Sequence, residues 1–179
     1  MRKELHRDKH LNLVFFEVYF TTMDFLEQEW GFRASAWLEG LGAVIWYRRS
    51  RSVIEFSFDA RDIVVSFRMR LEGTAVPDVF PPEAFPGAYS RIQDPLFELF
   101  LRLPYREERQ QFFSKLERKR MEQLRGQAVV QRDVEAARAV LEMEADFDAY
   151  WLRKYQQQIL EVVEPSGDAS GEQGQRQRC

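Results

Sequence analysis

The stretch VIWYRRSRSVIEFSFDARDIVVSFRM, from Val44 to Met69, alternates apolar with polar residues at a spacing of two. This period is typical of β-strands that bury one face and turn the other toward solvent. The pattern predicts four strands separated by the turn-forming segments EGLG, RRSRS and DARD. They are expected near residues 32–38, 43–48, 52–59 and 62–71. Short connections between consecutive strands favour an antiparallel meander.

The last hairpin of this meander has a predicted register. If DARD closes the turn with Phe58 opposite Ile63, then Phe56 lies opposite Val65, and the large apolar side chains share one side. The other side then collects the polar residues Glu55, Ser57, Ser66, Arg68 and Arg70. Alternation alone accounts for this polar face, and we expect it to be solvated or lightly covered.

Helices are predicted on both sides of the meander. Apolar residues at helical spacing indicate a first helix from about residue 10 to residue 30, ended by Gly31. After the meander, Asp94 offers an N-cap, and Pro95 suits the first position of a second helix. The expected fold class is α+β: an N-terminal helix, a four-stranded antiparallel meander, and a C-terminal helical region.

The C-terminal region is expected to contain an antiparallel helix pair. Pro104 can begin one helix, Gly126 breaks it, and a last long helix runs from 130 to 163. Residues 102–125 hold eight Lys or Arg and four Asp or Glu (+4), whereas residues 133–164 hold three and eight (-5). Opposite charges favour an antiparallel hairpin of these two segments, while their apolar stripes supply the stability.

A competing interpretation of the last helix is self-association. Its apolar residues approach a heptad seam: Val130, Val134, Ala137, Leu141, Trp151, Tyr155, Ile159 and Val162. A helix with such a seam can form a homodimer with its copy. Stripes of this kind more often belong to an intramolecular core, so we favour the hairpin and keep the homodimer as an alternative.

The length of 179 residues and the hydrophobic content of 45% suit one substantial core. We expect a single domain over residues 1–164, made of a helix and meander (1–73), a Pro-rich arm (74–94) and helices (95–164). A disordered tail follows at 165–179. Phe80, Phe85 and Tyr89 argue against disorder in the arm, which is expected to pack over the sheet or to present these aromatic residues to a partner.

Candidate catalytic and metal-binding groups are sparse. His6 and His10 are the only histidines and supply two of the four ligands that a zinc ion needs. Asp59 and Asp62 at the hairpin tip suit turn chemistry better than a cation site. The single cysteine, Cys179, leaves no internal disulfide. We therefore expect a non-enzymatic protein without a cofactor. No run is long and apolar enough to span a membrane, which favours a cytoplasmic location.

Nucleic-acid binding remains a weaker alternative. Arg118, Lys119, Arg120 and Arg125 form one basic segment, and RRSR at 48–51 forms a second. A basic helix face can contact phosphates. The net charge of -3, the glutamates interleaved at 117 and 122, and the acidic helix that follows favour internal neutralisation of the first segment.

The N-terminal half resembles small bacterial α+β proteins of the polymorphic-toxin immunity and defence-associated families. The resemblance covers roughly residues 11–71. It rests on a helix that ends in Phe25, Leu26, Glu27, Glu29, Gly31 and Phe32, followed by VIWYRRSRSVIEFSFD. It implies function by binding another protein and carries over no catalytic residue.

These observations favour a protein-binding module that acts within a complex. The expected contact residues lie on the polar sheet face and in the Pro-rich arm: Arg68, Arg70, Phe80, Phe85 and Tyr89. A self-associating assembly protein and a nucleic-acid-binding accessory domain are the alternatives.

Overall fold

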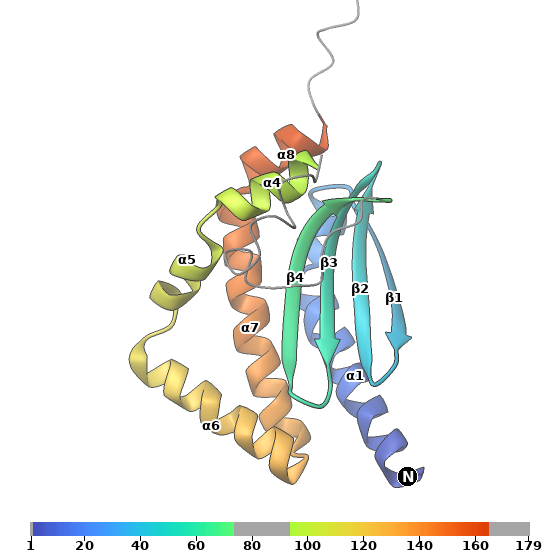
Figure 1. Cartoon of the computed structure of the whole chain (residues 1–179), viewed down its shortest axis with the longest axis vertical. Helices are drawn as coiled ribbons and strands as arrows, with labels where there is room; N and C mark the ends of the chain where they lie inside the picture. Colours follow the sequence, from blue (N-terminus) through green and yellow to red (C-terminus); the bar gives the residue numbers. More distant parts are fainter. Residues whose placement is uncertain (1, 74–93, 165–179) are drawn as a thin grey trace, which may run out of the picture.

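The computed structural model describes the backbone of residues 2–73 and 94–164, with side chains from Lys9 onward. The fold is α+β, as predicted (Figure 1). The N-terminal half contains α1 (Arg2–Thr22), α2 (Asp24–Gln28), β1 (Arg33–Glu39), β2 (Gly42–Arg49), β3 (Ser52–Asp59) and β4 (Val64–Leu71). The C-terminal half contains α4 (Pro95–Arg102), α5 (Tyr105–Phe112), α6 (Lys115–Gln131), α7 (Val134–Lys154) and α8 (Gln156–Val163). The predicted arm residues Phe80, Phe85 and Tyr89, and the predicted tail, lie outside the described residues.

The four strands form one antiparallel sheet in the order β1-β2-β3-β4. Helix α1 lies behind this sheet in Figure 1, with α7 beside it. Stacked and edge-on rings join the two layers: Phe15 of α1 stacks on Phe58 of β3 at 5.0 Å, and Phe67 of β4 meets Trp151 of α7 edge-on at 5.6 Å. The core therefore lies between the helices and one face of the sheet, which is called the inner face below. The opposite face is called the outer face below.

The predicted register of the last hairpin is wrong by two residues. Phe58 lies opposite Val65 and Phe56 opposite Phe67, because the turn includes Ile63. Ile63 adopts a left-handed backbone with φ +53° and buries its side chain. Such a conformation is unusual for a β-branched residue, so the sequence does not reveal it. A shift of two residues preserves the faces, so the apolar and polar sides are as predicted.

Helix α4 begins as predicted. The side chain of Asp94 caps α4 by accepting hydrogen bonds from the backbone N–H groups of Leu96 and Phe97, both at 3.0 Å. Its second carboxylate oxygen accepts the N–H of Leu71 at 2.6 Å, so one buried side chain joins the end of β4 to the start of α4.

Several predicted helix boundaries in the C-terminal half are wrong. The last helix, predicted as one piece over 130–163, begins at Val134 and is divided at Tyr155 into α7 and α8. The helix predicted to run from Pro104 to Gly126 is divided at Ser114, whose capping box with Glu117 starts α6. Helix α6 then continues through Gly126 to Gln131 and ends at Arg132, which is left-handed with φ +55°. A glycine inside a helix weakens it without ending it when the following residues can continue the turns.

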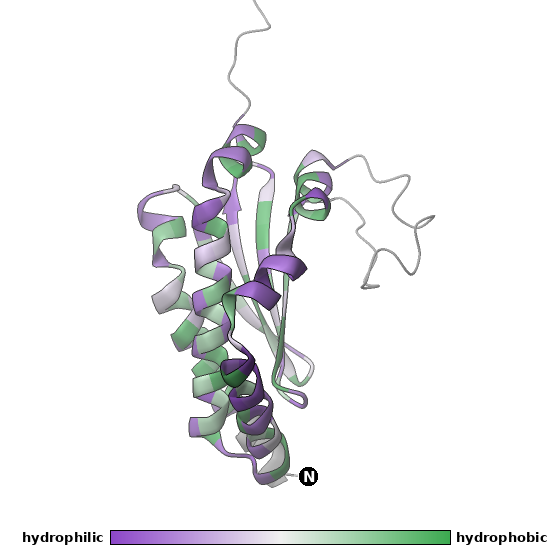
Figure 2. Cartoon of the chain, turned by 90° about the vertical axis from the view of Figure 1, so that its left-hand side faces the viewer, coloured by the Kyte–Doolittle hydropathy of each residue, from purple (hydrophilic) through white to green (hydrophobic). Residues whose placement is uncertain are grey.

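The predicted antiparallel pair is present as α6 and α7 (Figure 1). Figure 2 shows that α6 is strongly hydrophilic over its exposed side. The residues of the predicted heptad seam differ in burial. Ala137, Leu141, Trp151 and Ile159 are buried in the core, whereas Val130 is 81% exposed. The central residues of the seam thus form intramolecular core contacts.

Candidate functional site

The predicted polar face of the sheet carries arginine and tryptophan side chains from β1, β2 and β4, while β3 contributes Glu55 and Ser57. Two neighbouring rows of the register cross it: Arg33, Arg48, Val53 and Arg70, followed by Ser35, Trp46, Glu55 and Arg68. Trp37 lies on the same face next to Trp46. We call the side chains of Arg33, Trp37, Trp46, Arg48, Arg68 and Arg70 the arginine–tryptophan face.

Trp46 is the centre of this face. The guanidinium carbon of Arg48 lies 4.4 Å from the centroid of the Trp46 ring, and that of Arg70 lies 4.8 Å away. The ring of Trp37 meets Trp46 edge-on, with centroids 4.6 Å apart and an interplanar angle of 83°. Guanidinium groups at this distance are attracted by the negative ring face, and edge-to-face ring pairs are favourable. These contacts hold three side chains around one indole ring.

Glu55 holds the Arg70 side chain in position through hydrogen bonds. Its carboxylate accepts hydrogen bonds from Arg70 Nη2 at 3.0 Å and Nε at 3.3 Å, and from Ser57 Oγ at 3.1 Å. The two charged side chains are largely buried, at 11% exposure for Glu55 and 14% for Arg70. A carboxylate with little access to water requires such partners, so the pair orders Arg70 beside Trp46.

Only part of the outer face is open to solvent. Val44, Val53 and Glu55 are buried, whereas Arg33 and Ser35 are exposed, and Trp37, Trp46 and Arg48 are partly exposed. Of the residues predicted for a solvated or lightly covered face, Ser66 is exposed, Ser57, Arg68 and Arg70 are partly exposed, and Glu55 is buried, so the expectation fails only for Glu55. The centre of the face is a packed layer of arginine and tryptophan.

Arg68 and Arg70, the described members of the predicted contact set, lie on neighbouring rows of this face. The basic residues predicted to bind nucleic acid lie in two different environments. Arg118, Lys119 and Arg120 are exposed on α6. Arg125 instead faces the protein interior: its Nη2 binds Glu144 at 2.7 Å and its Nε donates to the carbonyl oxygen of Ile63 at 3.2 Å.

The other residues considered for chemistry are also placed. His10 is exposed on α1, and the side chain of His6 is outside the described residues. Asp59 accepts hydrogen bonds from the backbone and guanidinium of Arg61, which lowers the pKa of its carboxyl. Across the described side chains, no three His, Cys, Asp or Glu residues are grouped as a metal ion would need.

One buried titratable group was not anticipated. Asp148 of α7 accepts hydrogen bonds from the hydroxyls of Tyr19, at 3.0 Å, and Tyr105. Burial raises the pKa of Asp148 to about 7; the charge of Glu144 also raises it, and the tyrosine hydrogen bonds and Arg109 lower it. Three segments distant in sequence meet at this carboxyl, which is closed off from the outer face by the sheet.

Sequence reasoning missed the aromatic and β1–β2 parts of the face. Trp46 stands between the apolar residues Ile45 and Tyr47, so no alternation distinguishes its side of β2. Arg48 and Arg33 belonged to predicted turn or strand-end segments. The register of β1, β2 and β3 brings these residues together, and no local pattern encodes it.

No protein-family model, curated protein or solved structure matches this chain. Of the helices that the structure describes, none combines the length and apolar character needed to cross a membrane.

Proposed function

We propose that this protein binds an acidic segment of another protein through the arginine–tryptophan face. The observation that carries the proposal is the arrangement of Arg48 and Arg70 around Trp46, with Arg70 ordered by the largely buried Glu55. Trp and Arg dominate the energetics of protein interfaces because they bury large surfaces and make directed contacts. A face that is ordered before binding loses less side-chain entropy when a partner arrives.

The charge of the face supports an acidic partner. Among the described side chains, Arg33, Arg48 and Arg70 are balanced locally by two carboxylates only, Glu55 and Glu72, which lies 3.5 Å from Arg48. The whole chain has a net charge of -3, so this excess of positive charge is confined to one patch. Complementary charges at the rim of an interface raise the association rate and disfavour wrong partners.

The same geometry favours a protein over a single-stranded nucleic acid. Non-specific binding of single strands depends on aromatic rings on which bases stack. Here guanidinium groups approach the Trp46 ring and Trp37 contacts it edge-on, so the arginines already take the stacking positions. A carboxylate of a protein partner needs only guanidinium N–H groups, which an arginine keeps when it lies over a ring. The exposed Arg33 and the partly exposed Arg48 can offer them, whereas Nε and Nη2 of Arg70 are already bound to Glu55.

A toxin-type or defence-associated partner is the class that we propose, following the resemblance of residues 11–71. A protein that neutralises a toxin by binding it needs a stable complementary surface and no catalytic turnover. The packed sheet, with ordered cations on one face, has the properties that such a surface needs.

The test is affinity purification of the tagged protein from its native cells, with quantitative mass spectrometry. The face variant is Arg33→Glu with Arg48→Glu. The matched control is Arg102→Glu with Arg120→Glu, which makes the same charge change at exposed positions on α4 and α6. We expect a stoichiometric partner with an acidic segment that the control retains and the face variant loses. Equal recovery with both variants, or no partner with the unmodified protein, contradicts the proposal.

Two further outcomes identify the alternatives. Loss of a recovered nucleic acid upon changing Arg118, Lys119 and Arg120, with the face variant unaffected, would indicate the nucleic-acid-binding domain. A mass of two chains in sedimentation at tens of micromolar, where weak interfaces become populated, would indicate self-association.

A further inference from the structure

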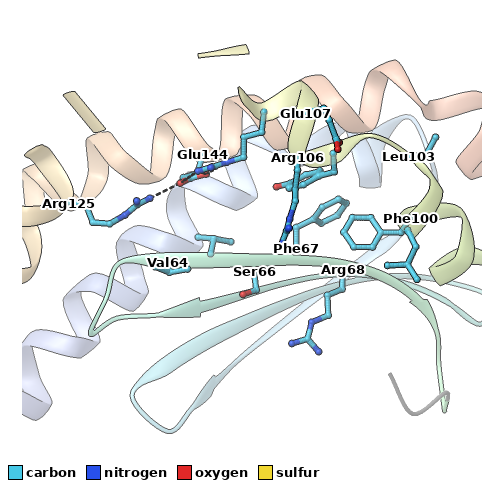
Figure 3. A pocket seen from close by; sticks show the side chains of 14 residues that line it. Val64, Ser66, Phe67, Arg68, Phe100, Leu103, Arg106, Glu107, Arg125 and Glu144 are labelled. Atoms are coloured by element: carbon cyan, nitrogen blue, oxygen red, sulfur yellow. Dashed lines mark hydrogen bonds and ion pairs between the residues drawn. The ribbon is translucent and has the colours of Figure 1, made fainter. Parts of the chain in front are cut away.

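Strand β1 is the outer strand of the sheet on the side opposite β4, and it forms the right-hand border of the sheet in Figure 1. Beside β4, side chains from the helical region, such as Phe100 and Glu107, line a cavity (Figure 3). In β1, by contrast, none of the seven residues Arg33–Glu39 is buried. Leu38 is 53% exposed, and Ala36 is also exposed. An accessible edge strand is a template for pairing with another strand.

The hydrogen bond of Ala34 shows which backbone groups of β1 point away from β2. The Ala34 N–H donates to a carboxylate oxygen of Glu27 at 3.0 Å, outside the sheet. Because successive residues of a strand direct their backbone groups to opposite edges, Ala36 and Leu38 share the orientation of Ala34. Within the described chain, no hydrogen bond reaches the N–H or C=O groups of Ala36 or Leu38. The edge of β1 therefore presents unpaired backbone donors and acceptors.

The composition of β1 does not oppose pairing with another strand. Native edge strands are commonly protected by proline, by a bulge, or by charged residues along the strand. Strand β1 contains neither Pro nor Lys, and its register with β2 runs without a bulge. Its charges stand at its two ends, Arg33 and Glu39, and the segment between them, ASAWL, is uncharged.

We propose that β1 pairs with β1 of a second copy of this chain, antiparallel and about a two-fold axis at Ala36. In this register Ala36 lies opposite Ala36 of the second copy, and Leu38 lies opposite Ala34 of the second copy. The outward groups of Ala36 and Leu38 then form backbone hydrogen bonds across the axis, while Glu27 keeps the Ala34 N–H. The exposed Leu38 side chain packs against Ala34 of the second copy, which removes apolar surface from water.

The charges of β1 select both this register and this occupant. Arg33 lies opposite Glu39 of the second copy, and the two-fold axis creates the same pair at the other end of the strands. Opposite charges directly across a strand pair are favourable, and like charges are unfavourable. A two-fold axis at Ser35 or at Trp37 would shorten the overlap and leave Arg33 without Glu39 opposite it. A pattern that is complementary to itself is what a two-fold interface between identical chains requires.

This pairing joins the two sheets into one continuous sheet. Residues directly opposite each other in neighbouring strands share one face, so the two arginine–tryptophan faces lie on the same side of the dimer. The interface goes beyond the proposed function, because it consists of the β1 edge and a copy of the same chain. It also differs from self-association through the C-terminal helices, which would use none of these residues.

The test is sedimentation equilibrium of the purified full chain, without a partner, from about 1 to about 200 µM, a range that reports weak interfaces. We expect the mass to approach that of two chains as the concentration rises. Arg33→Glu and Glu39→Arg each place like charges opposite each other at both ends of the strand pair, so each should weaken the dimer about tenfold or more. The matched control is Arg120→Glu, the same charge change at an exposed position of α6, which should leave the dimer unchanged.

A mixture of the two charge variants supplies the decisive comparison. A heterodimer of the Arg33→Glu chain with the Glu39→Arg chain has an opposite-charge pair at both ends, so it should form about as tightly as the unmodified dimer. A monomer over the whole concentration range, or a mixture that associates no better than either variant alone, would overturn the proposal. A dimer that neither charge variant weakens belongs to another surface, such as the C-terminal helices, and would also overturn it.

Backbone hydrogen exchange locates the interface. As the concentration rises, we expect new protection at the amides of Ala36 and Leu38 and little change at Ser35 and Trp37, whose backbone groups point toward β2. A dimer in which exchange at Ala36 and Leu38 is unchanged would contradict pairing through β1.

The dimer and the partner complex are tested separately. Glu39→Arg removes no cation from the arginine–tryptophan face, so this variant should lose the dimer and still retain the partner in affinity purification. A cross-linker at Ser35 reaches the second copy as well, but that product has the mass of two chains, which distinguishes it from a product with another protein.

Discussion

The carboxylate of Asp94 accepts the backbone N–H of Leu71 at 2.6 Å while its other oxygen caps α4. A capping aspartate ordinarily satisfies the first N–H groups of its own helix. Here the same buried side chain also binds the edge of β4 that faces away from β3, so it links the sheet to the C-terminal helices. Glu27 has the equivalent position at the other edge, where it accepts the N–H of Ala34 at 3.0 Å. At the same end of the sheet, each edge strand thus donates a backbone N–H to an acidic side chain, from the N-cap of α4 at one edge and from α2 at the other.

Replacement of Asp94 by Ala should therefore cost more than loss of an ordinary cap. Removing a cap costs about 1 kcal/mol, and the unpaired Leu71 N–H adds roughly 1 to 3 kcal/mol. The matched control is Asp133→Ala, because Asp133 caps α7 through the N–H groups of Glu135 and Ala136 alone. Urea denaturation of both variants measures the difference in the free energy of unfolding. Equal destabilisation would show that the Leu71 bond contributes nothing.

The buried carboxyl of Asp148 should make stability depend on pH. Its pKa is raised to about 7 by burial, with Glu144 adding to the shift and Tyr105, Tyr19 and Arg109 opposing it. The native state therefore keeps a proton that the unfolded state releases near pH 4, so the contribution of this group is full below about pH 4 and is lost as pH rises to about 7. The loss is on the order of 4 kcal/mol.

The measurement for Asp148 is the difference in unfolding free energy between the unmodified protein and Asp148→Asn from pH 4 to pH 8. We expect the unmodified protein to lose stability relative to Asp148→Asn as the pH rises to about 7. Above that pH the difference in unfolding free energy should stay constant. Subtracting the variant removes the opposite trend of other paired carboxylates, such as Glu29 and Glu108, whose pKa values are lowered. A difference that does not change with pH would contradict the assignment.

Arg70→Ala should destabilise the fold by about 3 kcal/mol, because it leaves Glu55 largely buried without its cation. Arg61→Ala breaks an ion pair of similar geometry, with Asp59 at 2.8 Å, on the exposed hairpin tip. That change should leave stability almost unaffected, since water and salt screen exposed pairs. Thermal or chemical denaturation of the two variants distinguishes them, and a small effect at Arg70 would mean that water reaches Glu55.

Two glycines should respond in opposite directions to alanine. Gly126 lies within α6 with open space around the position of a Cβ atom, so Gly126→Ala should stabilise the protein by roughly 0.5 to 1 kcal/mol. At Gly42 a Cβ atom would overlap the carbonyl oxygen of Phe58 on the neighbouring strand, and Gly42→Ala should destabilise by roughly 2 kcal/mol or more. Denaturant midpoints of the two variants test both signs, and a destabilised Gly126→Ala protein would argue against a continuous α6.

The sequence predicts the α+β fold, the four strands and the polar side of β3 and β4 because each rests on a local period. Its errors lie where backbone conformation departs from residue preference. Ile63 and Arg132 both adopt a left-handed conformation, and neither residue type announces it. The start of α6 was visible as Ser114 followed by Glu117, a capping-box spacing that the prediction overlooked.

The candidate site was less accessible to prediction than the fold. Arg70 was identified, but Trp46 is a neighbour only through pairing of β2 with β3 and β3 with β4, which are long-range relationships. Likewise, Arg125 belongs to a basic segment in the sequence and yet binds Glu144 and Ile63 within the fold. Charge runs therefore overestimate the free positive surface of α6.

The most direct test of the central proposal is site-specific photo-cross-linking in native cells. A benzophenone amino acid replaces Ser35, which is exposed on the arginine–tryptophan face, or Leu116, which is 76% exposed on α6. We predict that one protein partner is cross-linked from position 35 and not from position 116, and that Arg33→Glu with Arg48→Glu abolishes the product. A partner captured from position 116 alone, or from both positions equally, would contradict binding through the arginine–tryptophan face.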